Sequence, residues 1–252
     1  MRQTSRPKGN CGELRDKRDM MAAAQDSEVA IVDRILRNRR SIRRFRPDDV
    51  PVETVREILA VASHAPSGAN MQPWQVIVLS GDFKRELSNA LVAAFNTFSG
   101  ANRAEHEYYP DEYFEPYLSR RRKIGYDLYD SLGIARTDKA RRREQTARNY
   151  LFFDAPVGLI FTIDRGLKIG SWLDYGMFLQ SIALAARARG LDTCMQAAFA
   201  HMHKVLRERL SLPESRVVVC GMSLGYADTD APENRFAVER AAVEEFAVFH
   251  GL

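Results

Sequence analysis

Apolar residues begin to recur at helical spacing only after residue 27. Between Ser27 and Arg39 they lie three or four positions apart, which predicts an amphipathic helix with Ser27 as its N-cap. Residues 51–64 repeat the pattern, with one proline near the start and another just past the end. The chain before Ser27 is polar and lacks this periodicity. We therefore expect residues 1–27 to be a disordered tail and residues 28–252 to form one folded domain.

Short runs of β-branched and apolar residues predict strands, and helical periodicity fills the segments between them. The expected strands are 75–79, 155–163 and 216–224, and the expected helices are 83–98, 119–150, 172–189 and 201–210. Because strands alternate with helices, we expect an α/β or α+β fold with a central sheet flanked by helices. The helix over 172–189 is apolar almost all round, which is typical of burial in a core or a subunit interface.

The pattern is lost between residues 99 and 118, where acids and prolines are mixed with aromatic residues. These aromatic residues are Tyr108, Tyr109, Tyr113, Phe114 and Tyr117. Such a stretch is typical of a functional lid or an ordered excursion, and we treat residues 99–150 as one lid or helical excursion. Near the end, residues 240–250 hold several large apolar side chains. We expect them to form an extended arm or a late strand that packs on another subunit.

Composition narrows the class of protein. The chain is 45% hydrophobic and 28% charged, and no apolar run approaches the roughly 18 residues of a membrane span. Cys11, Cys194 and Cys220 are odd in number and widely spaced, which excludes a disulfide framework and a paired-cysteine metal motif. His201 and His203 are not spaced like a zinc pair on a helix. We expect a cytoplasmic protein with no membrane partner and no bound metal ion.

The formal net charge of +4 is concentrated at the start of the chain. The first 20 residues hold six basic and three acidic side chains, so the remainder is nearly balanced and gives little support for a nucleic-acid partner. We interpret the basic clusters at 120–123 and 141–143 as solvated helix faces or subunit contacts. The late onset of the apolar pattern leads us to expect that translation starts at Met20 or Met21, and that truncation to Met21 leaves folding and activity intact.

Two short stretches carry the candidate chemistry. Residues 39–43, Arg-Arg-Ser-Ile-Arg, combine guanidinium forks with a hydroxyl, a donor set suited to phosphate. By themselves they favour a solvated basic helix end, where cations also suit the helix dipole, and a phosphate site is the main alternative. Residues 65–74, Ala-Pro-Ser-Gly-Ala-Asn-Met-Gln-Pro-Trp, are rich in turn formers and amides and lead directly into the strand at 75–79.

Together these stretches resemble the flavin-binding signature of the nitroreductase family. Residues 186–194 are similar to the family's long-helix segment with Gly-Leu-x-Thr, and residues 220–226 to its Gly-rich strand end. The resemblance covers about residues 28–250. It implies a nitroreductase-like α/β (α+β) fold with a central mixed sheet, in an intertwined homodimer whose FMN sites are shared between the subunits.

The resemblance also implies which residues bind FMN. The phosphate, ribityl chain and pyrimidine edge would be held by Arg39, Arg40, Ser41 and Arg43. The partner subunit would contribute Pro66, Ser67, Gly68, Asn70 and Gln72. Backbone N–H groups facing flavin N5 and the ring would come from Met195, Gln196 and Ala197. A basic residue near the C-terminus would meet the phosphate, and this is Arg240 or, alternatively, Arg235.

The implied activity is reduction of nitroaromatic or quinone-like acceptors, with hydride taken from NADH or NADPH in ping-pong order and no catalytic side chain required. The motifs also resemble those of iodotyrosine deiodinase, so reductive dehalogenation is a second possibility, although Asn70-Met71-Gln72 replaces that group's His-Thr-Glu. A flavin-fragmenting enzyme of cobalamin-ligand synthesis is a remoter relative. A non-catalytic flavin-binding regulator is the alternative outside enzymes. The sequence reveals neither the physiological acceptor nor the preferred nicotinamide donor.

Overall fold

The computed structural model describes residues 27–97 and 103–251, and the chain divides after Arg39 into two units. In the first unit, residues 27–38 form the helix that the apolar spacing predicts, and its Val29, Val32 and Leu36 side chains are exposed. The expected disordered tail lies outside the described residues, except for residue 27, which begins this helix.

The second unit is built on a four-stranded sheet. In spatial order the strands are β1 (Gln75–Leu79), β2 (Val157–Asp164), β4 (Arg216–Gly225) and β3 (Asp192–Gln196). All three strand pairs are antiparallel, so the expected mixed sheet is antiparallel over the described residues, with parallel pairing confined to an isolated bridge between Ser41 and Thr193. β2 starts beside the end of β1, so these two strands run in opposite directions. β2 and β3 run in the same direction, but β4 lies between them and is antiparallel to both.

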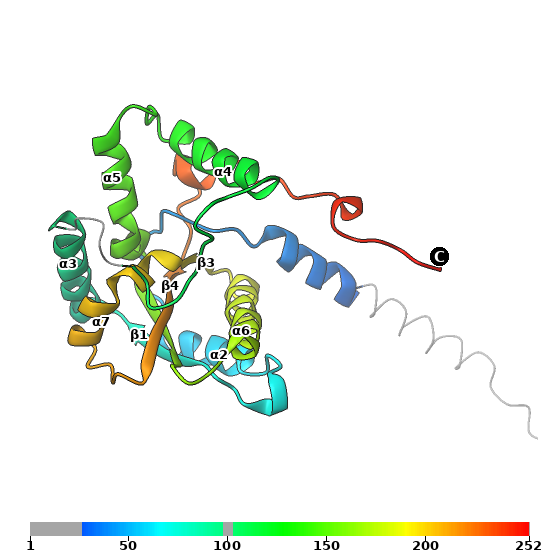
Figure 1. Cartoon of the computed structure of the whole chain (residues 1–252), viewed down its shortest axis with the longest axis horizontal. Coiled ribbons are helices and arrows are strands. Elements are labelled where there is room, and N and C mark those ends of the chain that lie inside the picture. The colour runs from blue at the N-terminus through cyan, green and yellow to red at the C-terminus, as the bar shows by residue number, and fades with distance from the viewer. Residues whose placement is uncertain (1–26, 98–102, 252) are drawn as a thin grey trace, which may run out of the picture. The chain divides into compact units, whose positions relative to one another are not determined.

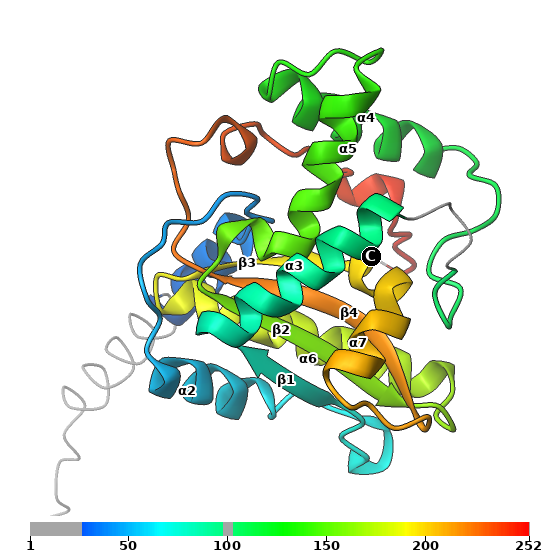
Figure 2. The ribbon, with the colours of Figure 1, turned by 90° about the vertical axis from the view of Figure 1, so that its left-hand side faces the viewer.

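Helices cover both faces of the sheet (Figure 2). One face carries α2 (Val52–Ala62) and α6 (Ile169–Ala188), and the other carries α3 (Gly81–Thr97), α7 (His203–Arg209) and the 3₁₀ segments η2 (Arg148–Asp154) and η3 (Ala197–Met202). Side chains of β2 alternate between the two layers. Leu159 and Phe161 join the α2–α6 core, whereas Ile160 joins the core under α3 and η2.

Two glycines let aromatic rings lie directly on the sheet. A Cβ atom at Gly158 would lie 2.6 Å from the ring of Phe152, and one at Gly221 would lie 2.3 Å from the ring of Phe199. Both distances are far inside van der Waals contact, so only glycine allows this close packing of η2 and η3 on the sheet.

Helix α6 is buried along one face only. Tyr175 and Phe178 lie in the core, but Ile169, Leu173 and Met177 are 78%, 68% and 39% exposed. Packing within the chain therefore covers the apolar side chains on one face of α6 and leaves those on the other face exposed. No helix in the described ranges has both the length and the apolar character needed to cross a membrane.

Residues 117–147 stand apart from the layers around the sheet (Figure 1). Residues 103–116 are irregular, and the expected helix over 119–150 is split into α4 (Tyr117–Ser131) and α5 (Lys139–Ala147) by a turn through Gly133. The C-terminal segment contains the 3₁₀ turns η4 (Pro232–Asn234) and η5 (Val243–Glu245) but no strand within residues 240–251. It is tied to α4 by ion pairs from Arg120 to Glu245 and from Lys123 to Glu239.

Candidate functional site

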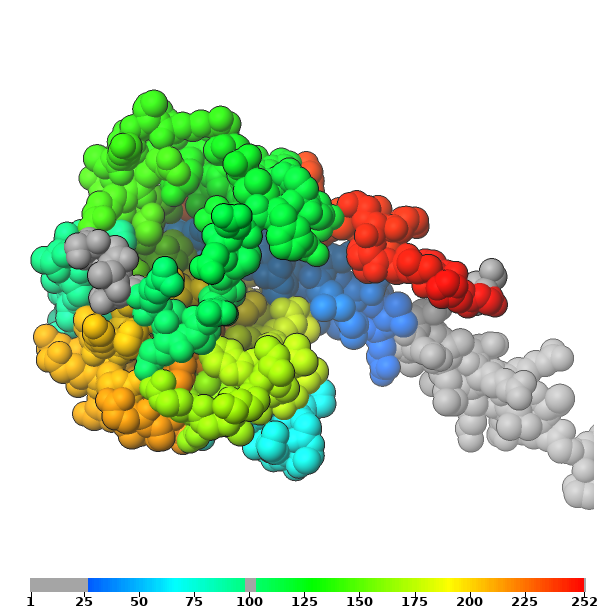
Figure 3. Space-filling model, viewed as in Figure 1, coloured from blue at the N-terminus to red at the C-terminus, as the bar shows by residue number. Residues whose placement is uncertain are grey.

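A cavity of about 650 Å³ lies where β3 and η3 meet the region of α4, α5 and η2. Figure 3 shows the surface hollowed between the green α4–α5 region and the yellow-to-orange segments below it. Met195 and Ala197 form part of the floor, Tyr129 and Tyr150 supply aromatic walls, and Tyr109 reaches it from the irregular stretch. The cavity therefore combines the end of a rigid strand with the segment that the sequence marks as a lid.

Residues 40–45 run beside β3 and place Arg43 in this cavity. The Ile42 N–H donates to the Thr193 carbonyl over 3.1 Å, and the Ile42 side chain is buried in the core. Because neighbouring side chains of an extended segment point in opposite directions, burial of Ile42 turns Arg43 the other way, toward the cavity. The Arg43 N–H donates to the Asn234 side-chain oxygen over 2.7 Å, which fixes the segment from its other side.

The outer edge of β3 presents backbone groups to the cavity. Thr193 uses its carbonyl on the side away from β4, and successive residues of a strand alternate, so the Met195 N–H faces that same side. The Met195 side chain is 39% exposed, whereas Gln196 is buried. The Gln196 amide accepts from the Ser223 hydroxyl over 2.7 Å and donates to the Asn149 carbonyl over 2.8 Å. Gln196 therefore supports the floor from below.

The loop over residues 65–73 does not line this cavity. It turns through positive φ angles at Ala69, Asn70 and Gln72, and the Gly68 N–H donates to the carboxylate of Asp174 on α6 over 3.2 Å. Pro66, Gly68, Asn70 and Gln72 are exposed, and Ser67 accepts from the Gln72 N–H over 2.9 Å. The loop is thus a shaped, outward-facing surface beside α6 rather than a wall of its own chain's cavity.

The remaining predicted arginines engage other groups. Arg40 donates to the Phe236 carbonyl, Arg235 pairs with Asp230 over 2.8 Å, and Arg240 donates to the Glu239 carbonyl over 2.9 Å. None of these three lines the cavity. Arg39 belongs to the first unit. Of the residues predicted from sequence, the cavity brings together Arg43, Met195, Gln196 and Ala197.

The structure adds wall residues that sequence reasoning did not select. Arg103, Gln145, Asn149 and His201 line the cavity, and they come from the irregular stretch, α5, η2 and η3. No local motif marks them, because only the tertiary fold brings these segments together. The described lining contains arginines but no Asp or Glu, so the cavity favours anionic or electron-rich ligands.

Two tyrosines of the cavity are held in the neutral form. Burial raises the pKa of the Tyr150 hydroxyl to about 12. Burial also raises the pKa of Tyr109, with a further contribution from Tyr113 and an opposing one from Arg121. Both rings therefore act near neutral pH as apolar surfaces with a hydroxyl donor. Within residues 27–97 and 103–251, no group of three or more His, Cys, Asp or Glu side chains is placed to hold a metal ion.

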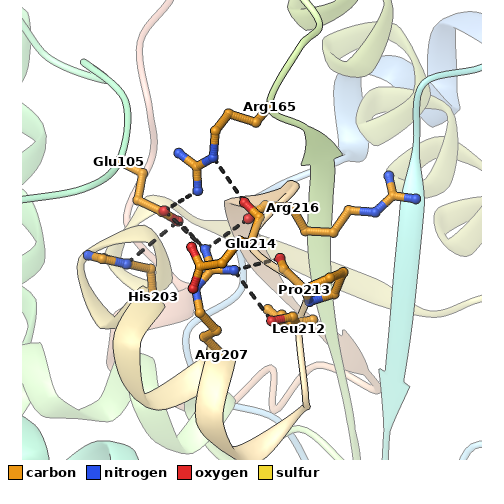
Figure 4. A network of polar contacts seen from close by, with 8 residues as sticks. All are labelled: Glu105, Arg165, His203, Arg207, Leu212, Pro213, Glu214 and Arg216. Atoms are coloured by element: carbon orange, nitrogen blue, oxygen red, sulfur yellow. Dashed lines mark hydrogen bonds and ion pairs between the residues drawn. The ribbon is translucent and has the colours of Figure 1, made fainter.

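A partly buried carboxylate anchors the irregular stretch at its base (Figure 4). Glu105 points between Arg165 and Arg207, with closest contacts of 2.6 and 3.0 Å, and lies 3.6 Å from His203. Burial would raise the pKa of Glu105, but the Arg165 hydrogen bond and the surrounding positive charges outweigh it and lower this pKa below its usual value. The stretch is therefore fixed to α7 and to the end of β2, while its Tyr109 lines the cavity.

The model of the nitroreductase family matches residues 36–226 of this chain. A nitrobenzene nitroreductase of Ectopseudomonas oleovorans is 43% identical over 218 residues, which cover 86% of this chain and 96% of that protein. A 4-nitrobenzoate reductase of Pseudomonas putida is 42% identical over 220 residues, covering 87% and 96% respectively.

Solved structures agree with these sequence relationships. The FMN-dependent nitroreductase NfnB from Mycobacterium smegmatis, determined in complex with NADPH, superposes with a TM-score of 0.84 at 32% identity, covering 88% of this chain and 99% of that one. A match over most of the chain, in both sequence and fold, establishes the relationship. The chain belongs to the nitroreductase family.

Proposed function

We propose that the protein is an FMN-dependent oxidoreductase that takes hydride from NADH or NADPH and reduces nitroaromatic compounds. The observation that carries this proposal is the convergence of Arg43 and the open edge of β3 at Met195 on one aromatic-walled cavity. The relatives' activities on nitrobenzene and 4-nitrobenzoate support the acceptor class.

The residues present fit an oxidised or reduced flavin ring. Arg43 brings a permanent positive charge to the cavity, which suits the negative charge that develops at the N1/O2 edge of a reduced flavin. The N–H of Met195 would serve as a donor for flavin N5, and the side chains of Met195 and Ala197 would offer an apolar floor to the ring. The lining contains no described carboxylate that would repel the reduced ring.

The phosphate group of FMN would be held by the other polar residues of the Arg-Arg-Ser-Ile-Arg segment. Arg39, Arg40 and Ser41 supply charge-assisted and neutral donors of the kind that phosphate requires. Arg235 or Arg240 would add a further cation from the C-terminal segment. Each of these two arginines is exposed at present and has only local partners, so either can be redirected at small cost.

We further propose a homodimer in which each subunit completes the other's site. The exposed apolar face of α6, with Ile169 and Leu173, needs a partner surface, and the outward-facing loop over 65–73 lies beside that same helix. Association through this face would present Pro66, Ser67, Gly68, Asn70 and Gln72 to the flavin of the partner. Phe246 and Phe249, which are 70% and 63% exposed, would pack as an arm on the second subunit.

The chemistry is centred on the flavin, and the side chains prepare the site. Bound FMN would supply the two-electron carrier between the nicotinamide donor and the nitro group. Arg43 would hold positive charge where electron density increases, and the Met195 N–H would be placed to donate to N5. Tyr109, Tyr129 and Tyr150 provide ring surfaces against which nicotinamide and then a flat acceptor can stack in turn, which supports ping-pong order. No side chain is assigned as a catalytic acid or base.

The natural acceptor is a small aromatic compound, and we place the enzyme in the cytoplasm, where the NADH and NADPH pools are held. The test of the proposed function is a visible spectrum of the purified protein, followed by identification of the released flavin. A yellow protein that releases FMN, is bleached by NADH or NADPH and is reoxidised by nitrobenzene supports the proposal. A colourless protein that takes up no added FMN refutes it. Turnover of halotyrosine in place of nitrobenzene would favour reductive dehalogenation.

A further inference from the structure

A second cavity, of about 420 Å³, lies between α4, α5 and the segment that carries Arg43. It shares Arg43, Leu128 and Tyr129 with the first cavity, so the two spaces adjoin. Its wall contains four arginines: Arg43, Arg121, Arg122 and Arg142. No described Asp or Glu lines it. We refer to this space as the four-arginine cavity.

The four guanidinium groups are not neutralised by carboxylates of the described chain. Arg121 lies over the ring of Tyr113 at 4.4 Å, and Arg142 lies over the ring of Tyr129 at 4.8 Å. By contrast, the adjacent cations on α4 are paired: Arg120 with Glu245 and Lys123 with Asp127. The acids near this helix therefore pair with cations outside the cavity. The arginines that line it have contacts with tyrosine rings and backbone carbonyls, such as that of Arg142 with the Arg136 carbonyl, but with no carboxylate of the described residues.

Like charges that converge on one space repel, and the arrangement is stabilised by an anion that binds between them. Arginine forks match the oxygens of a phosphate group in geometry as well as in charge. Tyr126, at 37% exposure, adds an aromatic surface to the same wall. The cavity is thus suited to a ligand that carries a phosphate next to a flat ring.

We propose that the four-arginine cavity binds the 2′-phosphate and adenosine end of NADPH, and that the enzyme therefore prefers NADPH to NADH. This inference rests on the proposed function, because it takes the nicotinamide ring to lie in the first cavity. A dinucleotide is longer than one cavity, so its adenosine end requires an adjoining site. NADH carries a hydroxyl where NADPH carries a dianionic phosphate, and only the phosphate makes use of the uncompensated arginines.

The first experiment compares kcat/KM for NADPH and NADH with nitrobenzene as acceptor, using the FMN-loaded enzyme. Arg121→Gln and Arg122→Gln should each lower kcat/KM for NADPH by about tenfold or more, mainly through KM, and leave the value for NADH nearly unchanged. The matched control is Arg120→Gln. This substitution makes the same charge change on the same helix, but outside the cavity, and should affect neither donor.

The second experiment measures binding without turnover. Adenosine 2′,5′-bisphosphate should bind the FMN-loaded enzyme more tightly than adenosine 5′-monophosphate in a calorimetric titration, and Arg122→Gln should remove that difference. Binding should also weaken as salt increases. Equal affinity for the two nucleotides would overturn the inference. Loss of FMN from Arg122→Gln would also overturn it, because the cavity would then hold the flavin phosphate.

The two proposals fail in different ways. Equal efficiency with NADH and NADPH, unaffected by Arg121→Gln and Arg122→Gln, would leave nitroaromatic reduction intact and overturn the assignment of the four-arginine cavity. Absence of nitrobenzene reduction with either donor would refute the proposed function. In that case the nucleotide titration still decides whether the cavity recognises a 2′-phosphate.

Discussion

The Ser223 hydroxyl donates to the side-chain carbonyl of Gln196 over 2.7 Å, and both residues are buried. The other end of the same amide donates to the Asn149 carbonyl over 2.8 Å. One side chain thereby joins β3, β4 and η2 beneath the floor of the cavity. A fully satisfied buried amide of this kind fixes the position of the strand on which the site depends.

Gln196→Leu should therefore lower the free energy of unfolding. The substitution leaves the Ser223 hydroxyl and the Asn149 carbonyl without their partner, at a cost of about 1–3 kcal/mol. Urea denaturation would measure the change. Ser63→Ala, which removes an exposed hydroxyl bonded to the Ala60 carbonyl, is the control and should change stability little. An unaltered urea midpoint in Gln196→Leu would contradict this role.

Gly221→Ala should destabilise the fold through overpacking. Its Cβ would lie 2.3 Å from the Phe199 ring, and Phe199 is itself fully buried, so the ring must move or the sheet must bend. We expect a loss of roughly 1–3 kcal/mol and a lower Tm. Gly125→Ala in the interior of α4 meets no atom within 4 Å, lies outside the proposed dimer face and should be neutral or slightly stabilising. Equal Tm values for the two variants would show that the packing is looser than described.

Arg39→Ala, Ser41→Ala and Arg43→Gln should each weaken FMN retention. Each removes a charge-assisted or neutral donor, worth roughly 1–3 kcal/mol, from the proposed flavin site. Fluorescence of released FMN during dilution would give the dissociation constants. Arg141→Ala is the control, because Arg141 is exposed and donates to the Leu132 and Gly133 carbonyls. Unchanged affinity in all three variants would argue against this placement of the cofactor.

Glu105→Gln should lower the free energy of unfolding near neutral pH, and this loss should become smaller in acid. The folded pKa of Glu105 lies below its usual value of 4.5, so its contribution is present above that value and is lost as pH falls through the folded pKa. The difference in unfolding free energy between parent and variant should be constant near neutral pH and shrink below about pH 4.5. Glu107→Gln is the matched control, because Glu107 is on the same stretch, is exposed and has no ion pair among the described residues. A pH-independent difference would mean that the charge of Glu105 is not what anchors the stretch.

Leu173→Arg should disrupt the proposed homodimer without unfolding the subunit. Leu173 is 68% exposed, so a charged side chain is tolerated in the single chain but not in an apolar contact between two copies. Light scattering would report the mass. FMN affinity should fall with dimer content if the loop over 65–73 completes the partner's site. A dimer that survives the substitution would point to a different interface.

Local pattern determined most of the elements but not the site. The strand at 75–79 was predicted with the bounds observed, because its β-branched run is bounded by turn residues. The turn through Gly133 and the short strand β3 were missed. A lone glycine is a weak signal for the end of a helix. The five residues of β3 show no clear alternation between apolar and polar side chains.

The same limit applies to the cavity. Arg43 and Met195, which line the cavity, were predicted as site residues because a family motif marks them. Arg103 and Asn149 lie in segments that only the tertiary fold brings together. The arginines of α4 were predicted to form a solvated face, but Arg121 and Arg122 line a cavity, and Asp127 of the same helix pairs with Lys123. Distinguishing a free cation from a paired one requires coordinates.

Arg43 lies in the wall of both cavities, and a single guanidinium cannot interact fully with two anions at once. Whatever occupies one space therefore changes the charge available to the other. By thermodynamic reciprocity, the two ligands must alter each other's affinity by the same factor. The rate at which the oxidised nucleotide dissociates should accordingly depend on the redox state of the flavin. This coupling would depend on Arg43, the side chain in the wall that the cavities share.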